Sequence, residues 1–130
     1  MNVKDELHQQ TSYNFIAAVL DVYNETGNGF FEEVYRENLG LKLTDRKIPF
    51  FNQPSLTLRH EGRVLKKQYQ PDLIIVGEIV VELKAVKFLA PEHKTRLINW
   101  LRATRQRIGY LINLAAFPRL ERKRSFSNLN

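Results

Sequence analysis

The sequence predicts an α/β (α+β) fold in which helices pack against a mixed β-sheet. Segments 5–25, 30–46 and 91–107 space their apolar residues by three or four, as amphipathic helices do. Segment 71–86, PDLIIVGEIVVELKAV, is almost wholly apolar and rich in β-branched residues, which is typical of strands buried in a sheet. The predicted order of elements is therefore α-α-β-β-β-β-α-β, which indicates helices layered on one sheet.

The first two helices are separated by a clear stop signal. TGNG, at residues 26–29, ends the helix expected over 5–25, because Gly and Asn accept the left-handed conformations of a helix end. The second helix should run from about 30 to about 46, with an apolar stripe of Phe31, Val34, Tyr35, Leu39 and Leu43. IPFFNQP then reads as a connection of extended character, since residues before proline avoid the helical region.

Two hairpins should follow this connection. Leu56 and Leu58 alternate with polar neighbours, and Glu61-Gly62 supplies a turn before a return strand over 64–70. Segment 71–86 forms the second hairpin, with its turn at Gly77-Glu78. Pro91 suits the first turn of the helix expected over 91–107, IGYLINLA is a further strand at 108–115, and the basic tail (about 118–130) could add an edge strand over 120–126.

Length and composition exclude several classes of protein. The chain has 130 residues, which indicates a single domain over 1–130 with room for a core. It has no cysteine, so disulfides, thiolate zinc sites, iron–sulfur clusters and cysteine nucleophiles are excluded. No apolar run has transmembrane length and the first residues are polar, so we expect a cytoplasmic protein without a membrane partner.

The positive charge is concentrated in the C-terminal third. The formal net charge is +6, and segment 94–124 holds nine basic residues against a single acid, Glu121. Such a skew favours a polyanionic partner, because Lys and Arg neutralise phosphates and release counterions. A solubilising surface would have the same composition, and charge alone does not separate the two interpretations.

Three charged residues interrupt the apolar segment 71–86. A charge inside a sheet is costly unless it is paired or holds a metal. Alternation places Glu82 and Lys84 on one face of their strand and Leu83 on the other, core-facing side. The position of Asp72 depends on the turn: a two-residue turn pairs it with Leu83, whereas a three-residue connection over 76–78, or one β-bulge, pairs it with Glu82.

If Asp72 faces Glu82, two carboxylates meet across neighbouring strands beside Lys84. Such a set suits a hard divalent cation such as Mg²⁺ or Mn²⁺, which can polarise a phosphate and lower the pKa of a bound water. The alternative is a salt bridge from Glu82 to Lys84, or to a helix, on a solvated face. On these three residues alone, the salt bridge is the more common arrangement.

Two motifs resemble a known family. Pro71-Asp72 followed by Glu82-Leu83-Lys84 has the form of the PD-(D/E)XK nuclease signature, and segment 29–35, GFFEEVY, reads as G-x-x-E-x-x-Y. That pattern names the GxxExxY family, small bacterial and archaeal proteins placed in the PD-(D/E)XK nuclease superfamily. The resemblance covers roughly residues 12–124, and the two motifs in this order are far more specific than either alone.

The resemblance implies a restriction-endonuclease-like core, a mixed sheet flanked by helices, and a metal-dependent phosphodiesterase site. In the superfamily the two acids hold Mg²⁺ or Mn²⁺, and here these would be Asp72 and Glu82. The backbone carbonyl of Leu83 would add a ligand, and Lys84 would assist the attacking water. An acid on an early helix approaches the same site, and Glu32 matches it.

Other positions are open to two interpretations. Glu32 is also an ordinary acid for a first helical turn, and Tyr35 should pack in the core with its hydroxyl at the site edge. His93 is more often a capping or surface residue than a site residue. Two departures from the family pattern are Arg96, where relatives have glutamine, and Tyr23, where they often have histidine. An arginine can contact phosphate, but it can also mark a drift from catalysis towards binding.

Two functions follow from these observations. The first is a metal-dependent nuclease for DNA or RNA, in which Arg96, Arg102 and Arg105 guide the nucleic-acid backbone. The second is a non-catalytic module on the same fold that binds nucleic acid or a protein partner, because a fold does not determine a function. A short chain leaves little room for a specificity domain, so a homodimer or a larger protein partner would fit either function.

Overall fold

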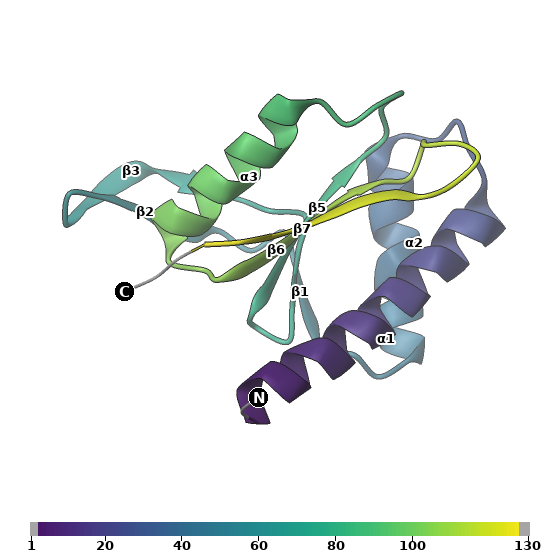
Figure 1. Cartoon of the computed structure of the whole chain (residues 1–130), viewed down its shortest axis with the longest axis horizontal. Coiled ribbons are helices and arrows are strands. Elements are labelled where there is room, and N and C mark those ends of the chain that lie inside the picture. Colours follow the sequence, from purple (N-terminus) through teal and green to yellow (C-terminus); the bar gives the residue numbers. More distant parts are fainter. Residues whose placement is uncertain (1–2, 128–130) are drawn as a thin grey trace.

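A five-stranded mixed sheet forms the centre of the fold, in the order β1-β4-β5-β6-β7 (Figure 1). The fold is that of a computed structural model, which describes residues 3–127 and, from residue 9 onward, their side chains. The helices are α1 (Val3–Thr26), α2 (Glu32–Asp45) and α3 (Pro91–Thr104). The strands of this sheet are β1 (Phe50–Asn52), β4 (Leu73–Ile75), β5 (Ile79–Lys84), β6 (Ile108–Asn113) and β7 (Glu121–Phe126). A separate two-stranded sheet is formed by β2 (Leu56–His60) and β3 (Arg63–Tyr69).

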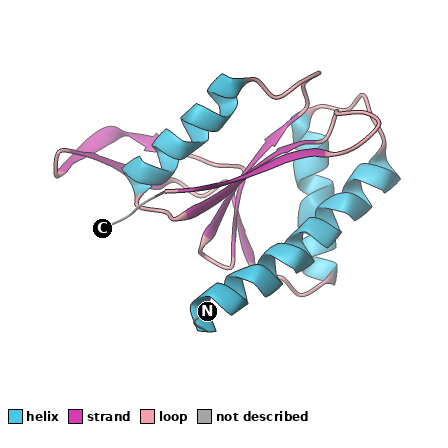
Figure 2. Cartoon of the chain, viewed as in Figure 1, coloured by secondary structure: helices cyan, strands magenta, loops and turns pink. Residues whose placement is uncertain are grey.

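Helices cover both faces of the five-stranded sheet (Figure 2). On one face α1 and α2 pack on a large core that includes Leu73, Val81 and Leu83. On the other face α3 and the β2–β3 hairpin pack on a smaller core around Val80 and Leu111. Both faces of β5 are therefore covered, which explains why its sequence is apolar at nearly every position.

The expected elements are present, with differences at their ends. The second helix begins at Glu32, because Phe31 has extended backbone and serves as its N-cap. The third ends at Thr104 rather than near 107, because Arg105 adopts a left-handed conformation (φ 60°) and its N–H closes on the helix end. The IPFFNQP connection contains a strand that sequence analysis did not assign: β1 pairs antiparallel with β4.

The β4–β5 hairpin has the longer of the two connections considered. Ile75 pairs with Ile79, and the register continues through Leu73 and Val81, so the connection is the three residues 76–78. Val76 and Gly77 both have positive φ (54° and 71°), as the tight turns that match strand twist require. One step beyond this register, Asp72 comes next to Glu82, close enough for its negative charge to act on that carboxyl, while its own carboxylate reaches Arg36 of α2. The two-residue turn is therefore wrong.

The central strands β5 and β6 are parallel and are joined through α3. Their carboxyl ends, at Lys84 and Asn113, are paired neighbours. The edge strand expected in the basic tail is β7, which pairs antiparallel with β6; residues 128–130 of that tail lie outside the described part of the chain. Across the described residues, no helix is long and apolar enough to span a membrane.

Candidate active site

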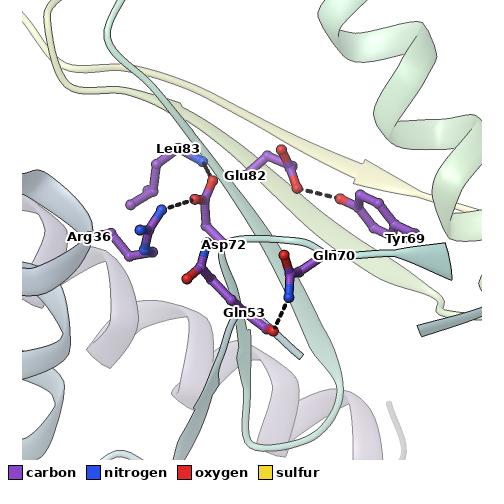
Figure 3. Close-up of polar contacts among 7 residues, drawn as sticks. All are labelled: Arg36, Gln53, Tyr69, Gln70, Asp72, Glu82 and Leu83. Atoms are coloured by element: carbon purple, nitrogen blue, oxygen red, sulfur yellow. Dashed lines mark hydrogen bonds and ion pairs between the residues drawn. The ribbon is translucent and has the colours of Figure 1, made fainter. Parts of the chain in front are cut away.

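Asp72 is held from two directions at the entrance to β4. Its Oδ2 accepts a hydrogen bond from the Leu83 N–H at 2.7 Å, which ties it to the backbone of β5. Its Oδ1 accepts from Arg36 Nη1 at 3.0 Å, and the two side chains are only 12% and 18% exposed (Figure 3). The carboxylate is thus fixed in position before any ligand arrives, because both of its oxygens have a donor.

Glu82 lies beside Asp72 and is fastened by a tyrosine. The Tyr69 hydroxyl donates to Glu82 Oε1 at 2.5 Å (Figure 3). The pKa of Glu82 is raised to about 7, chiefly by burial and also by the negative charges of Asp72 and Glu32, against the opposing effects of the Tyr69 hydrogen bond and Lys84. The ionised form of Glu82 is therefore disfavoured at this point of the sheet, and a bound cation would favour it.

An aromatic pair supports Glu82 from the α3 side. Tyr69 ends β3 and stacks on Trp100 of α3, with ring centroids 4.7 Å apart and planes 5° apart. The ring is almost fully buried, and burial together with the Glu82 charge raises the pKa of the Tyr69 hydroxyl. The hydroxyl therefore stays protonated and acts as a hydrogen-bond donor to Glu82. Sequence analysis did not single out Tyr69, although it stands two residues before the Pro71-Asp72 motif.

One face of α2 points towards the two acids. Glu32 is the first residue of α2 and is partly buried, and its charge is close enough to raise the pKa of Glu82. Arg36 stands one turn later on the same face and reaches Asp72. The spacing of four residues between Glu32 and Arg36 was the available signal for Arg36, which sequence analysis missed.

Lys84 and Arg96 meet Glu82 at a small cavity under α3. The cavity has a volume of about 20 Å³ and is lined by Glu82, Lys84, His93, Arg96, Leu97, Trp100 and Leu111. This volume holds roughly one water molecule. The expectations that Lys84 shares a face with Glu82 and that Arg96 turns to the same region agree with this lining.

His93 caps α3 and also lines the small cavity. Its Nδ1 accepts a hydrogen bond from the Ala90 N–H at 3.0 Å, which caps the start of α3. In the neutral ring, this bond assigns the proton to Nε2. Because His93 also lines the small cavity, it can cap the helix and still present a donor to the site.

Three expected site residues lie elsewhere. Tyr35 is fully buried as predicted, but its hydroxyl donates to the Gly27 carbonyl at 2.7 Å, so it fastens the α1–α2 loop rather than the carboxylates. Arg102 and Arg105 are exposed at the far end of α3 and do not line the small cavity. At about 1.5 Å of rise per residue, Arg102 is about 9 Å along the helix from Arg96.

A buried amide holds the segment that follows Lys84. Asn113 Nδ2 donates to the Val86 carbonyl at 2.8 Å and to Glu121 Oε1 at 3.0 Å, while its Oδ1 accepts from the Val86 N–H at 3.1 Å. Glu121 Oε1 also accepts from the Leu89 N–H at 3.0 Å. These bonds clamp the link between β5 and α3. Sequence analysis missed them, although a polar residue closing an apolar strand was a signal.

The donors at the site are hard oxygen ligands. Among the side chains that the structure describes, no three histidine, aspartate or glutamate groups converge on one point. Asp72, Glu82 and the Leu83 carbonyl nevertheless fit Mg²⁺ or Mn²⁺, since such ions are often held by one or two carboxylates with water completing the shell. The raised pKa of Glu82 is consistent with this fit, because burial disfavours the ionised carboxylate and a bound cation would favour it.

Comparison with known proteins gives the fold and the family of the chain. The crystal structure of a protein designated SSO0001 superposes with a TM-score of 0.57 at 19% identity, covering 75% of this chain and 52% of that chain. The present chain thus spans about half of that protein, and the likeness is one of fold. No curated protein sequence matches the chain. The family model of the PD-(D/E)XK nuclease superfamily matches residues 9–125, which include every element around Asp72 and Glu82. The chain therefore belongs to the PD-(D/E)XK nuclease superfamily and has its restriction-endonuclease-like fold, a mixed sheet flanked by helices.

Proposed function

We propose that this protein is a metal-dependent nuclease of the GxxExxY type that hydrolyses phosphodiester bonds of DNA or RNA. The observation that carries the proposal is that Asp72 and Glu82 lie close together beside Lys84, in a partly buried site. Membership of the superfamily supports a nucleic-acid substrate. A cytoplasmic location and a homodimer or larger partner remain predictions.

The carboxylates of Asp72 and Glu82 and the carbonyl of Leu83 would hold Mg²⁺ or Mn²⁺. Such a cation, when bound, polarises a phosphate oxygen and lowers the pKa of a bound water. The Leu83 N–H keeps Asp72 aimed across β5. Tyr69 occupies one oxygen of Glu82, which holds the side chain in one orientation and leaves its other oxygen for the cation.

Lys84 and Glu32 would position the attacking water. Lys84 lies on the face of Glu82 and lines the same cavity, so its ammonium can donate to the water or to a phosphate oxygen. Glu32 approaches from α2 and can accept the proton that the water loses. Arg96 would hold two oxygens of a phosphate, because a guanidinium can donate two parallel hydrogen bonds to them and a glutamine cannot.

A second candidate is a binding module that does not cleave. Two observations favour it: Arg36 already satisfies Asp72, and Arg96 replaces the glutamine of the family pattern. In such a module the guanidinium groups would bind phosphate, and the acids would serve only to position them. This candidate predicts tight, salt-sensitive binding without any change in the nucleic acid.

Cleavage by matched variants tests the proposal. Wild type, Lys84→Ala and Lys87→Ala are incubated with labelled single- and double-stranded DNA and RNA in Mg²⁺, Mn²⁺ or chelator. Lys87 is an exposed lysine three residues beyond the site, so its variant controls for loss of charge. We expect wild type to cut the nucleic acid. Chelator and the Lys84→Ala substitution should each abolish cutting, whereas Lys87→Ala should preserve it. Intact substrate under every condition, together with retained binding, would favour the binding module.

A further inference from the structure

The β2–β3 hairpin is an arm that stands apart from the main sheet. It forms its own two-stranded sheet, and Figure 1 shows it extending beside α3, away from α1 and α2. Its base is anchored by Leu58 and Tyr69, which are buried against Leu97 and Leu101 of α3. An isolated hairpin is only marginally stable in water, so α3 holds the arm in place.

Beyond this base, the arm has no core of its own. Residues 59–68 are all exposed, including Val64 (61%) and Leu65 (42%). This stretch holds four basic residues against one acid, Glu61: Arg59, Arg63, Lys66 and Lys67. The ion pairs found among the described residues involve none of these four cations. The arm therefore presents free positive charge to solvent.

The arm leads directly into the candidate active site. β3 ends at Tyr69, whose hydroxyl holds Glu82, and Asp72 follows three residues later. From Arg63 to Tyr69 the strand rises about 20 Å, at about 3.4 Å per residue. This is comparable with the rise of about six base pairs of a duplex. The base of the arm therefore lies beside the candidate active site.

We infer that the β2–β3 arm enters the major groove of B-form DNA, so that duplex DNA is the substrate class of the proposed nuclease; this inference rests on the proposed function. Paired strands are about 4.8 Å apart, and a two-stranded ribbon with its side chains fits a groove about 12 Å wide. The major groove of duplex RNA is too narrow and deep to admit it.

The amino-acid composition of the arm favours a duplex over a single strand as its partner. Proteins that hold single strands stack bases on exposed aromatic side chains. Residues 59–68 contain no Phe, Tyr or Trp, and the aromatic residue at the base of the arm, Tyr69, is buried in its stack with Trp100. At the same base, Arg102 and Arg105 are exposed at the end of α3, so they extend the positive surface of the arm.

The test compares two triple variants of equal charge change. The arm variant is Arg63→Gln, Lys66→Gln, Lys67→Gln, and the control is Lys47→Gln, Arg119→Gln, Lys123→Gln; all six residues are exposed. Binding to a short DNA duplex, an RNA duplex of the same sequence and each single strand is measured by fluorescence anisotropy over a range of salt, in chelator. Thermal unfolding by circular dichroism confirms that both variants fold.

We expect wild type to bind duplex DNA at least about tenfold more tightly than the other nucleic acids, and the arm variant to bind duplex DNA at least about tenfold more weakly than wild type. The slope of log affinity against log salt concentration should become shallower by about 2 to 3 in the arm variant. The control should keep affinity within a few-fold. An equal loss of affinity in both variants would overturn the inference, and so would a preference for single strands or for duplex RNA. Failure to bind any nucleic acid would also overturn it, and the partner of the arm would then be an acidic protein or a membrane surface.

The proposed function can fail separately. Because chelator prevents cleavage, the binding result does not depend on catalysis. Arm-dependent duplex binding without cutting in Mg²⁺ or Mn²⁺ would support the arm and contradict the nuclease. If the arm variant cuts as well as the control variant, the nuclease proposal is supported and the inference about the arm is overturned.

Discussion

Arg36 and Asp72, from α2 and the entrance to β4, form an ion pair in which Nη1 and Oδ1 are 3.0 Å apart. Both side chains are largely buried, and Asp72 is the acid to which the family pattern assigns the metal. A guanidinium and a divalent cation therefore compete for the same carboxylate. Arg36 supplies the positive charge that a buried carboxylate needs while the cation is absent.

Replacement of Arg36 should make stability depend on metal. Arg36→Met leaves the charge of Asp72 unpaired, so we expect the free energy of unfolding in chelator to fall by about 2–3 kcal/mol. Saturating Mn²⁺ should restore much of this loss, because a ligand that binds only the folded state stabilises it. Urea unfolding with and without Mn²⁺ measures both effects.

The control for this prediction is Arg46→Met. Arg46 pairs with Asp21 on the surface, where both partners are more than a third exposed. An exposed pair is screened by solvent, contributes little to stability and has no reason to respond to metal. A loss in Arg36→Met that is the same with and without Mn²⁺ would contradict competition for Asp72.

Glu82 should make stability depend on pH. Its pKa is about 7 in the folded protein and 4.5 as the ordinary value, so folding favours its protonated form. Its contribution to stability is therefore fully present below pH 4.5 and is lost as the pH rises through 7. In chelator, Glu82→Gln should remove this loss and flatten stability across that range, as urea midpoints would show. Glu61→Gln, at an exposed turn, is the control. If Glu82→Gln keeps the pH profile of wild type, Glu82 is not the group responsible for the pH dependence.

The Tyr69 hydroxyl should tune the affinity of Glu82 for cations. Its hydrogen bond lowers the pKa of Glu82, so Tyr69→Phe should raise that pKa further while keeping the stack on Trp100. Protons and cations compete for the carboxylate, so Mn²⁺ binding should require a higher pH than in wild type. Calorimetric titration at several pH values measures this shift. Tyr13→Phe, on an exposed face of α1, should leave it unchanged.

Replacement of Asn113 should lower the free energy of unfolding. Asn113→Leu is close in size but removes every bond to Val86 and Glu121, leaving buried polar groups without partners. We expect a loss of about 3 kcal/mol and faster amide exchange at Val86 and Leu89, where the clamp opens. Asn24→Leu, at an exposed position of α1, is the matched control. Unchanged exchange at both amides would show that the link holds without Asn113.

Replacement of Val76 should increase the stability of the protein. It is a β-branched residue at φ 54° and is 43% exposed, and a left-handed conformation costs such a residue about 1–2 kcal/mol. Val76→Asn creates the Asn-Gly pair that this turn prefers, so thermal unfolding should show a gain of about 1 kcal/mol. Gly77→Ala, at φ 71° and with open space around the added methyl, should change stability in the opposite sense. A loss in both variants would contradict this account of the turn.

Local patterns in the sequence predicted most of the fold. The periodicity of α1, α2 and α3 and the alternation of Leu56 and Leu58 depend on neighbouring residues alone, so they were readable. The strand β1 was missed because three residues beside a proline carry little signal, and its partner β4 is distant in the chain.

The candidate site was predictable only in part. Asp72, Glu82 and Lys84 belong to a motif within one hairpin, whose turn leaves only two registers to choose between. Contacts between distant elements could not be read in the same way: Arg36 reaches Asp72 only because α2 packs across the sheet. The hydroxyl of Tyr35 was misplaced because periodicity gives the face of a helix, but not the partner at the end of a long side chain.

The three-residue connection between β4 and β5 ties the site to the integrity of the sheet. Side chains exchange faces with each one-residue shift, so a deletion there would turn Asp72 away from Glu82. The same shift would take Leu73 and Ile75 out of the core under α1 and α2. A lineage that changed the length of this turn would thus lose the fold together with the acidic pair, so surviving variants should differ there in residue type rather than in number.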